Sequence, residues 1–122
     1  MRQKQSELQD DELIAVILRA AARAEEYLAG KSLEEFLADP QLQDALGACT
    51  LVMGQAAREV TEMLRNWTSH VPWIQLDELA DWRLYGYRDE RRTRQLWEFI
   101  QNWLPMIRAS LQSSWSPTHL CL

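Results

Sequence analysis

The sequence predicts an all-α protein, built as an up-down bundle of four to five helices. Three observations lead to this prediction. Apolar residues recur at helical spacing, three or four positions apart, along each long segment of the chain. Capping residues, glycines and prolines separate these segments from one another. No stretch of the sequence alternates apolar and polar residues as a half-buried β-strand does, so a helical bundle is the expected architecture.

Size and composition are those of a single globular domain. The chain has 122 residues, of which 47% are hydrophobic and 25% are charged, so it can bury a core of ordinary size. The net charge of −5 argues against uniform binding along nucleic acid but is compatible with a local basic site. Two cysteines do not make a disulfide framework. Without a signal-peptide pattern or a membrane-spanning run, the protein is expected to be cytoplasmic and without membrane contact.

The first long helix is expected to follow a flexible N-terminus, residues 1–9. Asp10 can cap it, and Gly30 can end it by adopting the left-handed conformation. The pattern Ser32-Leu-Glu-Glu35 then predicts a capping box at the start of a short helix. Between Asp10 and Gly30, the apolar positions at helical spacing are Ile14, Ile17, Leu18, Ala21, Ala24 and Leu28.

A second long helix is expected over residues 40–65. Pro40 suits its first turn, where the missing N–H would be unpaired in any case. Gly47 and Gly54 lower its intrinsic propensity, and a glycine inside a helix often marks the close approach of a neighbour. Pro72 then ends the helical pattern, because it disfavours helical geometry at the residue before it.

The last third of the chain predicts a short helix over 74–84, a turn at 85–87 and a final long helix that begins near Asp89. Pro105 should kink this final helix. The expected organisation is therefore a flexible N-terminus, one helical-bundle domain and a loose C-terminal tail, over residues 1–9, 10–112 and 113–122.

Several short motifs occur in one order along residues 27–111. They are Leu33-Glu-Glu-Phe-Leu37, Asp44-Ala45, Gly54-Gln-Ala-Ala57, Val71-Pro-Trp73, Leu96-Trp97 and Trp103-Leu-Pro105. In this order they resemble the HepT-like proteins of the HEPN superfamily, which are small helical-bundle ribonuclease toxins usually encoded beside a minimal nucleotidyltransferase antitoxin. The resemblance implies a HEPN-like bundle, a homodimer and a nucleotidyltransferase partner, with RNA as a further possible ligand.

The catalytic motif of this family, Arg-Asn-x-x-x-His-x-Tyr, follows the Pro-Trp pair by a few residues. Its Arg and His act on the scissile phosphate and ribose, in a cleft formed as two protomers pair, without a metal or other cofactor. Here Ala80 stands in place of the Arg and Asp81 in place of the Asn. Tyr85 stands in place of the His, and a tyrosine, with an ordinary pKa of about 10, is a poor base near neutral pH. Only Tyr87 matches, at the tyrosine that the family's antitoxin can modify with AMP.

These departures predict a HepT-like toxin–antitoxin component that binds a small nucleotidyltransferase and has lost its ribonuclease site. No cofactor or metal is expected, because His119 and Cys121 are too isolated to form a closed zinc site.

A second stretch offers an alternative site. Arg65-Asn-Trp-Thr-Ser-His70 has the Arg-Asn-x-x-x-His spacing, although it precedes the Pro-Trp pair and has Pro72 where the motif requires Tyr. Accepting it gives up the gap-free match between residues 54 and 73. Arg65 could instead be a cation at the end of a helix, and His70 a loop residue. An active RNA endonuclease that uses Arg65, His70 and the arginines of 88–94 is the alternative hypothesis.

A cluster of arginines gives residues 83–94 a local charge of +3, because this stretch contains five arginines and only two acids, Asp89 and Glu90. This cluster could bind RNA phosphates or an acidic partner, or it could be a solvated helix start in which Glu90 pairs with Arg94. A plain helical interaction module is the third hypothesis. The five arginines are Arg83, Arg88, Arg91, Arg92 and Arg94.

Overall fold

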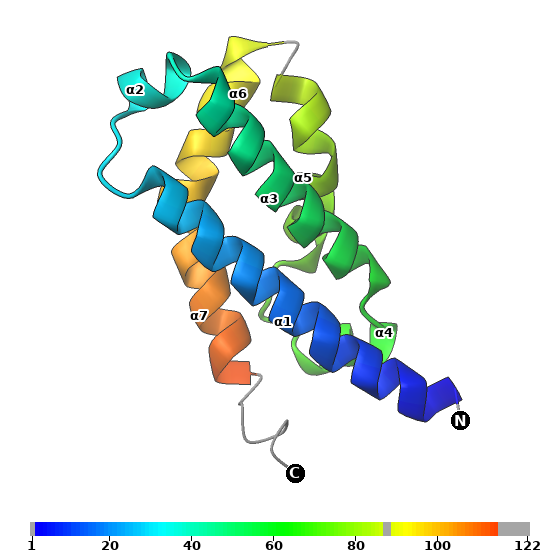
Figure 1. Ribbon diagram of the computed structural model, residues 1–122. Coiled ribbons are helices and arrows are strands. Elements are labelled where there is room, and N and C mark those ends of the chain that lie inside the picture. Colours follow the sequence, from blue (N-terminus) through cyan, green and yellow to red (C-terminus); the bar gives the residue numbers. More distant parts are fainter. Residues whose placement is uncertain (1, 87–88, 115–122) are drawn as a thin grey trace.

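The computed structural model describes residues 2–86 and 89–114 (Figure 1). Within these residues the structure is helical and has no strand, which confirms the all-α prediction. The elements in order are α1 (Arg2–Leu28), α2 (Leu33–Leu37), α3 (Pro40–Glu59), α4 (Glu62–Trp67), α5 (Trp73–Gly86), α6 (Glu90–Glu98), the π-helical turn η1 (Phe99–Trp103) and α7 (Leu104–Ser114).

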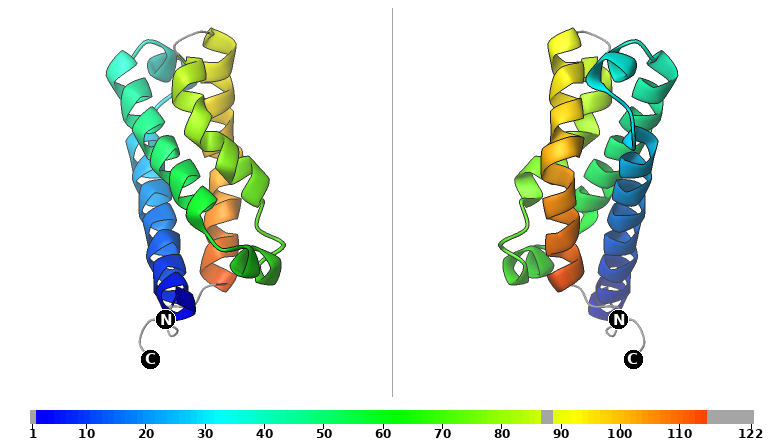
Figure 2. Two further views of the ribbon diagram at one scale, coloured as in Figure 1. Left: turned by 90° about the vertical axis from the view of Figure 1, so that its right-hand side faces the viewer. Right: turned by 90° about the vertical axis from the view of Figure 1, so that its left-hand side faces the viewer.

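The long helices form an up-down bundle. α1, α3 and α5 run in alternating directions, and α6, η1 and α7 join into a fourth rod (Figures 1 and 2). α3 packs most extensively against α5 and α1, while the fourth rod contacts α5, α1 and the short α2. None of the described helices is long and apolar enough to cross a membrane.

The first helix begins at Arg2, well before the start predicted at Asp10, so Asp10 is not its cap. The Asp10 side chain is buried, and its carboxylate accepts hydrogen bonds from the backbone N–H of Thr61 at 3.0 Å and from the Thr61 hydroxyl. A buried carboxylate needs such partners, so this contact fixes α1 against the segment between α3 and α4.

The predicted caps around α2 are confirmed. Gly30 ends the first helix region with a φ of 76°, in the left-handed region. The Ser32 hydroxyl accepts the N–H of Glu35 at 3.1 Å, and the Glu35 carboxylate accepts the N–H of Ser32 at 3.0 Å. Asp39 caps α3 by accepting the N–H of Leu42, and Pro40 is the first residue of that helix.

The single helix predicted over 40–65 is wrong, because the chain breaks at Val60 and Thr61. Val60 is extended, with φ −65° and ψ 137°, and Thr61 caps α4 through its hydroxyl. The N–H of Thr61 is taken by Asp10 instead of a helical carbonyl. Val60 and Leu64 are both buried, so the apolar pattern continues across the break and conceals it.

In the last part of the chain, the helix predicted over 74–84 is longer than expected. α5 continues to Gly86, so residues 85 and 86 are helical and not part of a turn. The kink expected at Pro105 stays a prediction, but the π-helical turn η1 lies directly before Leu104 and Pro105, and the N–H of Leu104 donates to the carbonyl of Phe99. The wider π-helical turn precedes a residue that has no N–H and whose ring crowds the previous turn.

α3 and α5 cross closely in the core, at Gly54 and Ala80. A Cβ added to Gly54 would lie 2.2 Å from the backbone nitrogen of Ala80, far inside van der Waals contact. The close approach predicted from a glycine inside the helix is therefore confirmed at Gly54. The crossing brings Ala80 against α3.

Candidate functional site

The first two motif positions lie in the middle of α5, at the crossing with α3. Ala80 is partly buried against Gly54. Asp81 is exposed, and its carboxylate lies 3.3 Å from Nη2 of Arg58 on α3. Both side chains of this pair are about half exposed, 47% and 53%, so solvent screens the attraction. At these two positions α5 therefore carries only the methyl group of Ala80 and the carboxylate of Asp81, which is already paired with Arg58.

A second ion pair lies one turn earlier on α5. Arg65 binds the Asp77 carboxylate with two hydrogen bonds, Nη2 to Oδ1 at 2.9 Å and Nη1 to Oδ2 at 3.1 Å. Its guanidinium also donates to the carbonyl of Ala57 and lies 5.5 Å from the centre of the Trp73 ring. The bidentate geometry and the aromatic contact fix Arg65 as a link between α3, α4 and α5.

An open hollow of about 550 Å³ lies beside this second pair. Its lining residues are Arg58, Val60, Glu62, Arg65, Asn66 and Asp77. Because Glu62 and Asp77 stand next to the two arginines, the hollow has mixed charge. Such a surface attracts a phosphate less than an unpaired arginine cluster does.

The residues of the alternative site are divided between the two ends of α5. His70 is exposed in the loop before α5, whereas Arg91 and its neighbours begin α6 beyond the other end (Figure 2). α5 has 14 residues and is therefore about 20 Å long. A single chain does not bring His70 and the α6 arginines together.

The α6 arginines are largely paired with local acids. Nη2 of Arg94 lies 3.7 Å from Oε1 of Glu90, which confirms the predicted pairing one turn apart. Nε of Arg91 lies 3.5 Å from Oδ2 of Asp89. Asp89 also caps α6 by accepting the N–H of Arg91 at 2.9 Å. Arg92 approaches the side chain of Gln95. This arrangement is that of a solvated helix start.

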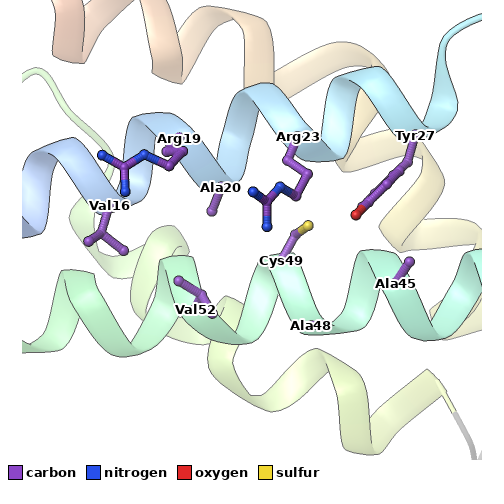
Figure 3. A pocket seen from close by; sticks show the side chains of 9 residues that line it. All are labelled: Val16, Arg19, Ala20, Arg23, Tyr27, Ala45, Ala48, Cys49 and Val52. Atoms are coloured by element: carbon purple, nitrogen blue, oxygen red, sulfur yellow. The ribbon is translucent and has the colours of Figure 1, made fainter.

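Sequence reasoning missed a groove between α1 and α3 (Figure 3). Arg19, Arg23 and Tyr27 follow one another at four-residue spacing along α1, and that spacing was the available signal. Burial raises the pKa of the Cys49 thiol at its base, and the charge of Arg23 partly opposes this. The groove has a volume of about 370 Å³ and is lined by Val16, Arg19, Ala20, Arg23, Tyr27, Ala45, Ala48, Cys49 and Val52.

A family model described as "Ribonuclease HepT-like" matches residues 17–114, which is most of the chain. The chain belongs to the HepT-like ribonuclease family. This confirms the resemblance seen in the ordered motifs. Comparison with curated proteins and with solved structures finds no match.

The remaining motif positions of this HepT-like chain are only partly described. Tyr85 lies in the last turn of α5, where the backbone alone is described, and the same holds for Arg83. Tyr87 and Arg88 lie outside the described residues, as do His119 and Cys121. The described part of the motif is thus Ala80 and Asp81, with their contacts to α3.

Proposed function

We propose that this HepT-like chain is a toxin–antitoxin component that binds a small nucleotidyltransferase and no longer cleaves RNA. The observation that supports the loss most directly is Ala80, which stands where the family has its catalytic arginine. Its methyl group lies at the α3–α5 crossing. The next motif position, Asp81, carries a negative charge where a phosphate would have to bind.

The chemistry of metal-independent RNA cleavage needs two groups that these positions do not supply. A base must take the proton of the 2′-hydroxyl, and a cation must stabilise the charge that develops on the phosphorane. Two described arginines that contact α5, Arg58 and Arg65, are held in ion pairs by Asp81 and Asp77. Tyr85, in the position of the histidine, is a poor base near neutral pH.

The experiment for this part of the proposal is incubation of total tRNA with the purified wild-type protein and with His70→Ala. We expect no cleavage by either. Ser69→Ala is the matched control, because it changes the neighbouring exposed loop residue. Cleavage that is lost in His70→Ala but kept in Ser69→Ala would establish the alternative site and contradict the proposal.

The partner part of the proposal concerns Tyr87, at which a nucleotidyltransferase would add AMP. The test uses the nucleotidyltransferase encoded beside this protein, with ATP and Mg²⁺, and measures the intact mass. We expect the mass of one adenylyl group to be added to the wild type and to Tyr85→Phe, but not to Tyr87→Phe. The absence of an adjacent nucleotidyltransferase gene would favour the plain interaction module.

The proposed assembly is a homodimer, as the family resemblance implies. Light scattering of the purified chain tests it directly. A mass of two chains is the expected result, and a single-chain mass across the micromolar range would contradict it.

A further inference from the structure

The groove between α1 and α3 combines apolar side chains with two cations on one rim. α3 contributes the small side chains of Ala45, Ala48 and Val52, which leave room between the helices. From α1, Arg23 and the Tyr27 ring extend towards α3 (Figure 3). Tyr27 is 40% exposed and Val52 is 41% exposed, so large apolar surface on both sides meets solvent.

The two cations of the rim differ from most arginines whose side chains the structure describes. Within the described residues, five other arginines form ion pairs with carboxylates. Arg19 and Arg23 form none with the side chains that the structure describes. This face therefore presents two arginines that no described carboxylate holds in an ion pair.

We propose that the α1–α3 groove binds an amphipathic helix of a partner protein, with carboxylates one helical turn apart that pair with Arg19 and Arg23. The lining extends from Val16 to Tyr27 along α1, about 17 Å or three helical turns. An apolar helix face laid in the groove would cover Tyr27 and Val52, as in other helix-in-groove complexes. This proposal does not depend on the partner being a nucleotidyltransferase.

Charge favours a different protein over a second copy of this chain. A two-fold interface places the same patch of each copy against the other. If the two-fold axis passed through the groove, the Arg19 and Arg23 pairs of both copies would meet, and four guanidiniums would repel one another. An acidic helix instead meets these cations with opposite charge.

The test measures fluorescence anisotropy of two labelled peptides of about 18 residues, or five helical turns, with the full chain. Both peptides carry the same Leu and Ala face. One carries Glu residues four positions apart beside this face, and the other carries Lys at the same positions. We expect the Glu peptide to bind roughly tenfold more tightly, because two partly exposed pairs are gained.

Two variants connect this binding to the groove. The double variant Arg19→Glu/Arg23→Glu should reverse the preference, so that the Lys peptide binds more tightly. Arg91→Glu/Arg94→Glu makes the same change of charge on α6 and should leave the preference unchanged. Equal affinity for both peptides, or no binding of either at about 1 mM, would overturn the proposal.

A third variant fills the groove. Ala48 is exposed on α3, so Ala48→Trp should fold and should abolish binding of the Glu peptide. Ala109→Trp, at an exposed position of α7, is the matched control and should bind normally. If Ala48→Trp instead converts a dimer to a monomer in light scattering, the occupant is a second copy and the proposal is wrong.

Discussion

Replacing Gly54 by alanine should destabilise the protein, although alanine is the better helix former. The intrinsic gain is about 1 kcal/mol in a helix interior. The added Cβ, however, would lie 2.2 Å from the backbone nitrogen of Ala80 and 2.8 Å from its Cα. Ordinary contact begins at 3.4 Å, so α3 and α5 would have to separate by about 1 Å at their crossing.

The net effect follows from these two opposing contributions. Overpacking a core costs about 1–3 kcal/mol, and the upper end applies here because backbone, and not a flexible side chain, must move. The expected loss in the free energy of unfolding is therefore about 2 kcal/mol. For a chain of this size, this lowers the melting temperature by about 8 °C. Thermal melting by circular dichroism and urea titration would measure both quantities.

Two further variants separate packing from other causes. Gly30→Ala meets open space but has a φ of 76°, so only backbone strain of about 1 kcal/mol is expected. Adding Ala80→Gly to Gly54→Ala should restore little, because the nitrogen and Cα of residue 80 remain in place. A Gly54→Ala protein as stable as the wild type, or full rescue by Ala80→Gly, would refute the packing argument.

Three other predictions concern single side chains. Asp10→Ala leaves two donors of Thr61 without their acceptor, so urea titration should show a loss of about 1–3 kcal/mol; unchanged stability would contradict the contact. Hydrogen bonds from the Ser32 backbone and hydroxyl lower the pKa of Glu35. In an NMR titration, Ser32→Ala should therefore raise this pKa part of the way towards 4.5. An unaltered pKa would contradict the capping box. Because the folded-state pKa is the lower one, the stabilisation from Glu35 is present above the unfolded pKa and is lost as pH falls through the folded pKa. Burial raises the pKa of the Cys49 thiol. In a variant that keeps only this cysteine, iodoacetamide should therefore react more slowly with the folded than with the urea-unfolded protein at pH 8. Equal reaction rates would contradict the burial of Cys49.

Local signals in the sequence predicted the fold class and most helix ends correctly. The capping box at Ser32, the left-handed Gly30 and the start of α6 near Asp89 each depend on residues a few positions apart. The break between α3 and α4 was missed because it depends on Asp10, which is far from Thr61 in sequence. A continuous apolar stripe carried no sign of that contact.

The candidate site shows the same division. The alignment of Ala80 with the family's catalytic arginine could be predicted from the sequence, because it depends only on the distance from the Pro-Trp pair. The partners of Asp77 and Asp81 were not, since Arg65 and Arg58 reach them only through the packing of α3 and α4 on α5. The α1–α3 groove could not be predicted either, because its lining residues come together only when α1 packs against α3.

The most direct test of the central claim is RNA cleavage by the wild type beside a variant with the family motif restored. This variant combines Ala80→Arg, Asp81→Asn and Tyr85→His. If these positions alone account for the loss, the wild type leaves total tRNA intact and the restored variant cleaves it. Cleavage by the wild type that disappears in His70→Ala would contradict the account, because the active site would then lie outside the α5 motif.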